Sequence, residues 1–221
     1  MHRHALKAVL LSSTLMFMGT GSAFAQDQNQ SQPDETRIHF KMIVSPGAST
    51  CLPNASADVD IITQTPDSQA EDMFIVATGL PANTAFDFFV IQVPNAPFGL
   101  SWYQGDMHTG SDGDATQHFR GRFSIETFII APGVAPAPQV FTDPPFPDAL
   151  QNPATLGPDG KTPGPVQTYH LGLWFNSPAD AQANGCPNTV TPFNGEHNAG
   201  IQVLNTAQYP DTQGPLQLLR P

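Results

Sequence analysis

The run Phe86–Val93 constrains the fold more than any other part of the chain. Aromatic and β-branched residues dominate its sequence, FDFFVIQV, and favour a strand. Pro94 ends the strand because proline cannot donate to a ladder. Alternation places Phe86, Phe88 and Val90 on one face and Asp87, Phe89, Ile91 and Val93 on the other. Both faces are mostly apolar, so the run predicts a central strand that is covered on each side.

A compact turn, Gly79–Thr84, precedes this strand. Pro81 presets its own φ, and Asn83 can hydrogen-bond the local backbone. The sequence GLPANTAF resembles the turn before strand F of immunoglobulin and fibronectin type III domains, with Phe86 in place of their tyrosine. The resemblance implies an immunoglobulin-like sandwich without the tyrosine hydrogen bond. The chain also resembles uncharacterised secreted bacterial proteins, which implies no activity.

Residues 1–25 have the pattern of a signal peptide. Arg3 and Lys7 precede a short apolar run, and Ala23-Phe24-Ala25 forms a small-x-small cleavage site. The alternative is a membrane anchor, but the apolar run is short for a span. We therefore expect a periplasmic or secreted protein, with a polar, disordered segment 26–36 before one domain, 37–221.

The net charge argues against two classes of partner. The whole chain has a formal charge of −11, and removal of the two leader cations makes it −13. Such a charge opposes binding to nucleic acid and to anionic membrane surfaces. No later stretch predicts a membrane span. The partners that we expect instead are a protein or a carbohydrate ligand.

Cys51 and Cys186 are the only cysteines of the chain. In an exported protein an even pair predicts a disulfide, which here would join distant parts of the chain. The alternative is a redox-active pair, but such pairs are usually close together as CxxC.

About eight strand-like runs lie between turn signals. They are Arg37–Val44, Asp58–Thr65, Glu71–Thr78, Phe86–Val93, Leu100–Met107, Phe119–Ile130, Tyr169–Asn176 and Gly200–Asn205. One short helix is predicted from Ser177 as its cap to Gly185 as its stop. The fold class expected is all-β: an antiparallel, immunoglobulin-like β-sandwich with a long proline-rich insertion, residues 131–167.

The proline-rich segment 131–167 is long for a connection within a domain. It contains spaced apolar residues, among them Phe141 and Phe146. Several strands also place apolar side chains on faces that would otherwise be wet, namely Phe89, Ile91, Phe128, Ile130 and Trp174. We expect the segment to cover them, with Phe141 and Phe146 as anchors. The alternative is that the apolar surface binds a partner.

Five histidines follow the leader, and two of them suggest a metal site. His108 and His118 are placed symmetrically about Gly113, so a hairpin there would set them opposite each other. Zn or Cu could then bind both, completed by His170 or an aspartate. The alternative is two exposed histidines without a cofactor. Asp106, Asp112 and Asp114 suggest calcium, but their spacing is not that of an EF-hand.

Three aromatic residues, Trp102, Tyr103 and Trp174, suggest a platform for sugar rings, with burial in the core as the alternative. The chain contains no nucleophile elbow, phosphate loop, HExxH or CxxC, so no catalytic residue can be assigned. The sequence favours an exported, non-enzymatic binding or structural module. The alternative is a metal-dependent or carboxylate-based extracellular enzyme, for example one that acts on glycans.

Overall fold

The computed structural model describes residues 36–63, 70–123, 127–130, 164–192 and 197–219. Only the backbone is described for residues 36, 127–130 and 164–167. The predicted signal peptide and the proposed anchors Phe141 and Phe146 lie outside the described residues.

Strands dominate the described part of the chain, as predicted. The elements are β1 (Thr36–Val44), β2 (Ser56–Thr63), β3 (Glu71–Thr78), β4 (Ala85–Ile91), β5 (Ser101–His108), β6 (Ala115–Gly121), β7 (Thr127–Ile130), β8 (Gly164–Gln167), β9 (His170–Phe175), α1 (Pro178–Ala183), β10 (Gln202–Asn205) and the 3₁₀ helix η2 (Pro215–Leu219). Ser177 caps α1 and Pro178 opens it, as the sequence predicts.

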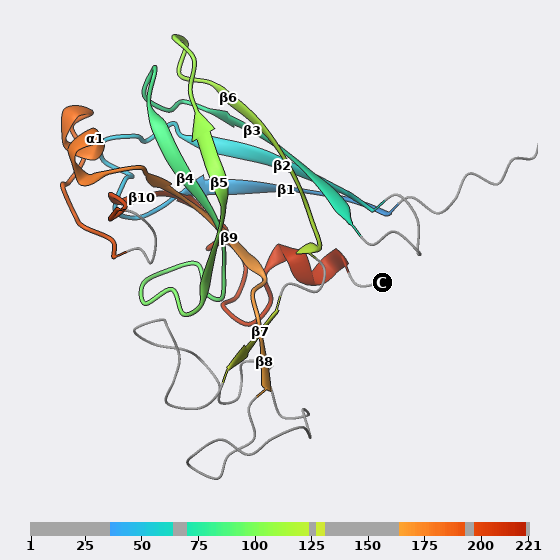
Figure 1. The fold of residues 1–221 in the computed structure, drawn as a ribbon. Helices are drawn as coiled ribbons and strands as arrows, with labels where there is room; N and C mark the ends of the chain where they lie inside the picture. The colour runs from blue at the N-terminus through green and yellow to red at the C-terminus, as the bar shows by residue number, and fades with distance from the viewer. Residues whose placement is uncertain (1–35, 64–69, 124–126, 131–163, 193–196, 220–221) are drawn as a thin grey trace, which may run out of the picture. The chain divides into compact units, whose positions relative to one another are not determined.

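Eight strands form one antiparallel sheet in the order β5-β4-β9-β10-β1-β2-β3-β6 (Figure 1). The sheet curls into a nearly closed barrel shape. The prediction of an all-β antiparallel fold is confirmed. The immunoglobulin-like sandwich is not shown, because these strands hydrogen-bond into a single sheet and not into two separate layers.

Side-chain packing joins the two end strands, β5 and β6. β5 pairs with β4, and β6 pairs with β3. The ring of Phe119 on β6 stacks on Phe88, with centroids 5.2 Å apart. It also lies against Gly105 on β5, where an added Cβ would be 2.9 Å from Phe119 Cε1. Glycine therefore permits the close approach that brings the sheet ends together.

The inner face of this sheet surrounds the main hydrophobic core. On β3, Met73, Ile75 and Ala77 are buried whereas Phe74 and Val76 are exposed, as strand alternation requires. β4 and β9 contribute the aromatic centre, including Phe86 and Phe175, whose centroids are 5.1 Å apart. Burial of each such side chain stabilises the fold by roughly 1.5–3 kcal/mol.

The outer face of β4 and β9 is also covered, which confirms the prediction for the central strand. Phe89, Ile91 and Trp174 form a second buried cluster with Ala199, and Phe98 packs against it. Phe98 comes from the loop after β4, in which the Pro94 carbonyl accepts hydrogen bonds from the Gln202 and Asn205 side chains. The loop directly after β4 therefore covers part of the outer face of β4 and β9.

The predicted strand Phe119–Ile130 is wrong as a single element. β6 ends at Gly121, and β7 pairs with β8 in a separate two-stranded sheet. Phe128 and Ile130, which depart from the alternation of the earlier residues in the sequence, belong to β7 and not to β6. β8 was missed because its four residues, GPVQ, include a glycine and a proline, which are uncommon in strands.

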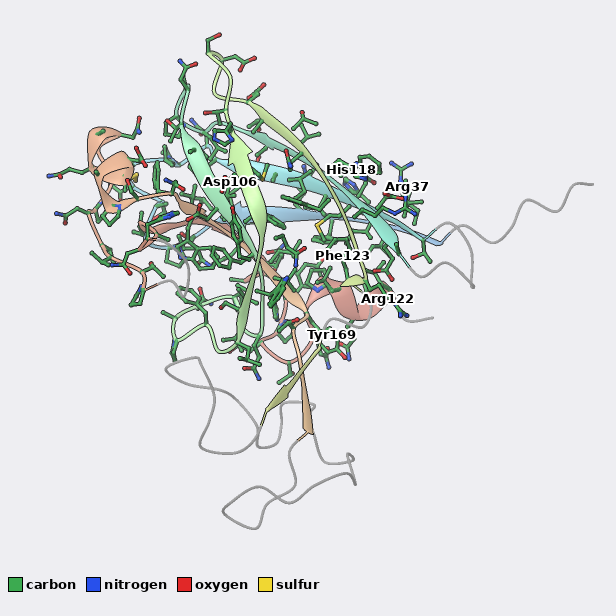
Figure 2. The ribbon with its side chains drawn as sticks, in the orientation of Figure 1. Arg37, Asp106, His118, Arg122, Phe123 and Tyr169 are labelled. Atoms are coloured by element: carbon green, nitrogen blue, oxygen red, sulfur yellow. A yellow bond between two sulfur atoms is a disulfide. The ribbon has the colours of Figure 1, made fainter. Side chains whose placement is uncertain are left out.

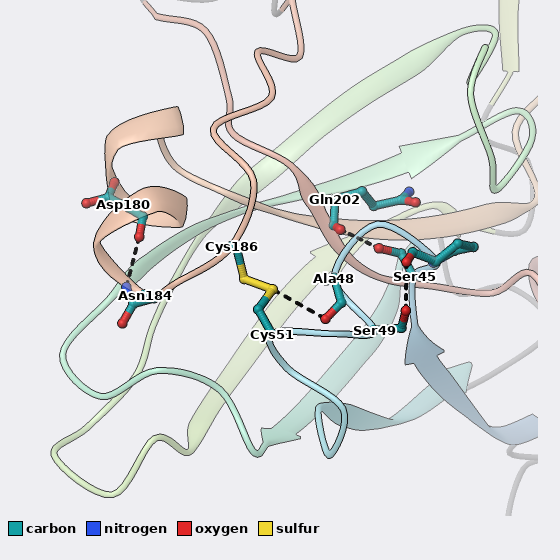
Figure 3. The surroundings of a disulfide bond; sticks show 9 residues. Ser45, Ala48, Ser49, Cys51, Asp180, Asn184, Cys186 and Gln202 are labelled. Carbon is teal, nitrogen blue, oxygen red and sulfur yellow. Dashed lines mark hydrogen bonds between the residues drawn. A yellow bond between two sulfur atoms is a disulfide. The ribbon is translucent and has the colours of Figure 1, made fainter.

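Cys51 and Cys186 form a disulfide, as predicted, with their Cα atoms 5.3 Å apart (Figure 3). The bond joins the loop after β1 to the segment after α1, where the Cys186 amide donates to the Ala181 carbonyl. A disulfide is consistent with an oxidising location outside the cytoplasm. In the part of the chain that is described, no helix has the length and apolar character needed to span a membrane.

Candidate functional site

Asp106, Asp87 and Trp174 lie side by side on the outer face of the sheet, on the neighbouring strands β5, β4 and β9. Asp87 at the centre of β4 is the ladder partner of Asp106 on β5 and of Trp174 on β9. Direct cross-strand partners share a face and have Cβ atoms about 4.5–5.5 Å apart. Tyr103 and His197 join them through the contacts given below. We call these five residues, Asp87, Tyr103, Asp106, Trp174 and His197, the Asp87 cluster.

Asp87 is fully buried, with a relative exposure of 0%. Neither of its carboxylate oxygens has a hydrogen-bond partner among the described residues. The nearest ionisable group is the imidazole of His197, whose Nε2 lies 3.5 Å from Oδ2 and whose side chain is 43% exposed. A buried carboxylate that lacks hydrogen bonds is unusual, because removing such a group from water is costly.

Trp174 supplies a second buried polar atom without a partner. Its residue is 3% exposed, and its Nε1 has no hydrogen-bond partner within the described segments. The indole ring lies over Gly172, where an added Cβ would be 2.3 Å from Cζ3. Phe89 and Phe98 contact the same ring edge to face, at centroid distances of 5.2 and 5.0 Å. The indole is therefore fixed in place while its N–H is left unused.

The exposed side of the cluster is formed by Asp106 and Tyr103. The Tyr103 hydroxyl donates to Asp106 Oδ1 at 2.5 Å. Burial and this hydrogen bond raise the pKa of Tyr103, so the phenol keeps its proton at neutral pH. Figure 2 shows Asp106 apart from His118 and Arg37, which lie in another part of the sheet.

Burial raises the pKa of Asp87 to about 6, an effect that attraction to His197 opposes and the neighbouring charge of Asp106 reinforces. Asp87 can therefore exchange a proton near neutral pH, or accept hydrogen bonds from a bound group when it is ionised. Both properties are typical of functional sites.

Acids elsewhere on the sheet have conventional partners. On the outer face of β1 and β2, Lys41 donates to Asp58 and Arg37 donates to Asp60. Asp72 on β3 lies 2.7 Å from His118 Nε2 and 3.5 Å from Arg120. These pairs form an ordinary charged strand face. Asp72 is buried like Asp87, at 5% relative exposure, but it has both His118 and Arg120 beside it, whereas Asp87 has neither an Arg nor a Lys partner among the described residues.

The ladders do not pair the two histidines proposed for a metal. His108 is opposite Ala85, and His118 is opposite Phe74, on which its ring stacks with centroids 4.5 Å apart. The hairpin geometry that suggested the site is therefore missing. His170 is buried, and its Nδ1 is hydrogen-bonded to Thr206 Oγ1. Within the described ranges, no three His, Cys, Asp or Glu side chains are grouped to hold a metal ion. Zn or Cu binding by His108 and His118 stays a prediction.

The predicted aromatic platform is assembled only in part. Tyr103 and Trp174 belong to one series of rings, because Phe89 contacts both of them. Trp102 is the ladder partner of Val90, a core residue, so it lies on the opposite face of β5 from Tyr103. Trp102 is 50% exposed. The prediction places the adjacent residues Trp102 and Tyr103 in one platform, although they lie on opposite faces of β5.

Sequence reasoning missed Asp87 and His197 as site residues. A lone aspartate in the apolar run FDFFVIQV was the available signal, since an unpaired charge is rarely placed in such a strand. His197 had no comparable signal, because only the fold brings it to β4. No protein-family model and no curated protein matches the sequence. The site must therefore be interpreted from its own chemistry.

Proposed function

We propose that this protein is an exported, non-enzymatic binding module that holds a small polar ligand at the Asp87 cluster. The observation that supports the proposal is the fully buried carboxylate of Asp87, which has no hydrogen-bond partner in the described part of the chain. A ligand that donates a hydrogen bond to Asp87 would offset the free-energy cost of burying that carboxylate without a hydrogen bond. The nearby Trp174 N–H could hold an acceptor atom of the same molecule.

Export rests on the leader-like residues 1–25 and is supported by the disulfide. The immunoglobulin-like sandwich that the turn before β4 suggests stays a proposal. Of the two ligand classes expected from the sequence, a carbohydrate matches this small polar ligand, and a protein ligand stays a prediction.

The second candidate is a carboxylate-based enzyme. Asp87 and Asp106 are direct cross-strand partners in different surroundings: one is buried with a raised pKa, and the other is exposed and hydrogen-bonded to Tyr103. Acid–base catalysis by two carboxyl groups requires such a difference, and glycoside hydrolysis is the best-known example. Glycan hydrolysis is therefore the alternative to binding.

The experiment compares release of nitrophenol from a panel of 4-nitrophenyl glycosides by the purified protein, by Asp87→Asn and by Asp106→Asn. The binding proposal expects the same background rate from all three proteins. A rate well above background that both substitutions abolish would contradict the proposal and establish the enzyme. Asp114→Asn, in an exposed turn, is the matched control for the loss of one charge.

A further inference from the structure

The ligand class can be narrowed by the charges that surround Asp87. Its ladder partner Asp106 is also an acid, and Asp180 in α1 adds a further negative charge at longer range. The one basic side chain recorded within 4 Å of Asp87 in the described chain is His197. By contrast, Arg or Lys side chains reach Asp58, Asp60 and Asp72. The Asp87 cluster therefore has an excess of negative charge.

Aromatic rings adjoin these carboxylates on the same face. Phe89 is two residues from Asp87 on β4, and its ring contacts both Trp174 and Tyr103, at centroid distances of 5.2 and 5.6 Å. Aromatic faces attract cations, and their attraction is strongest where water is excluded. They also provide apolar contact for the carbon atoms of an organic ligand.

We propose that the Asp87 cluster binds the primary ammonium group of a small organic molecule. The ammonium donates to Asp87 and Asp106, and the attached carbon atoms lie against the rings of Trp174 and Phe89. This inference rests on the proposed binding function and gives it a ligand class. An ammonium group supplies hydrogen-bond donors to the Asp87 carboxylate and a permanent positive charge, whereas the imidazole of His197 is charged only when it is protonated.

His197 occupies the position that the ligand would take. Its Nε2 is 3.5 Å from Asp87 Oδ2, beyond the ordinary range of a hydrogen bond, and its side chain is 43% exposed. We infer that the ammonium displaces this imidazole from Asp87. Replacement of His197 by alanine should therefore strengthen binding, whereas Asp87→Asn should weaken it.

The test follows the indole N–H resonance of Trp174 by NMR, with the indole of Trp102 as an internal reference. The intact protein is titrated at about pH 8 with n-butylammonium and, separately, with n-butanol, which has a similar shape but no charge. We expect a saturable shift of the Trp174 signal with the amine only. Asp87→Asn should weaken binding roughly tenfold or more, Asp114→Asn should leave it unchanged, and His197→Ala should strengthen it.

A second pair of probes distinguishes an amino sugar from an aliphatic amine. Glucosamine and glucose differ by one amino group, so binding of glucosamine alone would support an amino-sugar source of the ammonium. A Trp174 shift caused equally by glucose, and lost in Asp87→Asn, would overturn the ammonium inference while the binding function stands. Failure of both amines to shift the signal, in the natural protein and in His197→Ala, would also overturn the inference. Nitrophenol release that depends on Asp87 would instead contradict the binding function itself.

Discussion

Asp87 places an ionisable carboxyl group where the described neighbours offer it no hydrogen bond. Strand alternation in FDFFVIQV correctly predicts that Asp87 shares a face with Phe89 and Ile91. Alternation cannot predict that Asp106, Trp174 and His197 are neighbours of Asp87. Strand register places the first two and the segment before β10 places His197, and both depend on contacts between distant parts of the chain. The sequence therefore identifies Asp87 as an unusual residue, but it does not predict the other members of the Asp87 cluster.

His170 is a second buried ionisable residue, and its role is structural. The Leu171 amide donates to Thr206 Oγ1, which leaves the threonine hydroxyl free to donate to His170 Nδ1. Nε2 then carries the proton and faces the carbonyl oxygens of Pro210 and Asp211, each 3.2 Å away. His170 thereby attaches the C-terminal segment to β9.

Burial lowers the pKa of His170, so the native state disfavours the imidazolium. Unfolded chains bind this proton below about pH 6.5, so the contribution of His170 to stability is complete above that pH and is lost as the pH falls. We expect ¹⁵N NMR to show the Nε2–H tautomer at neutral pH and a titration midpoint below the ordinary value for histidine. A midpoint at or above that value would contradict the assignment.

At the scale of elements, the junction of β5 and β6 depends on a glycine. Gly105 has φ +150°, a conformation that side chains disfavour, and it lies directly against Phe119. The sequence predicts β5 and β6 but not that these two strands pack against each other. Alternation shows which side chains share a face of a strand, and it does not show which strands are neighbours. The single sheet in place of a sandwich, and the division of Phe119–Ile130 between two sheets, escaped prediction for the same reason.

Gly105→Ala should destabilise the protein by roughly 2–4 kcal/mol, since it combines backbone strain with a clash against Phe119. Gly185→Ala is the control, because Gly185 has φ +75° but no atom within 4 Å of the added Cβ. Urea unfolding should show the larger loss for Gly105→Ala. Equal losses would mean that packing of Phe119 on Gly105 does not hold the sheet ends together.

At the scale of the whole molecule, the disulfide links parts of the chain that are 135 residues apart in sequence. The cysteine count and the leader predicted this bond, because an even pair in an exported chain has few alternatives. Neither feature predicts how the bond is positioned between the loop after β1 and the segment after α1.

Replacement of both Cys51 and Cys186 by alanine should lower the free energy of unfolding by about 4–5 kcal/mol in the chain-entropy model. The natural protein, unfolded without a reductant, should contain no thiol that reacts with Ellman's reagent. Two reactive thiols, or an unchanged unfolding midpoint in the double variant, would show that the bond is absent in solution.

Under the proposed binding function, Asp87 is retained for its ligand at the expense of stability. Its pKa is raised from 3.8 to about 6 in the folded protein, so the native state holds the proton more tightly than the unfolded state between these values. Stability therefore falls as the pH rises through this window, by up to about 3 kcal/mol, and the loss is complete above it.

Urea unfolding of the natural protein and of Asp87→Asn, at about pH 4 and about pH 8, measures the stability cost of the Asp87 carboxylate. We expect Asp87→Asn to be more stable than the natural protein at the higher pH, by up to about 3 kcal/mol, and nearly equal to it at the lower pH. Asp114→Asn should show no such difference. A loss of stability in Asp87→Asn at the higher pH would mean that the Asp87 carboxylate supports the fold, and would contradict the account.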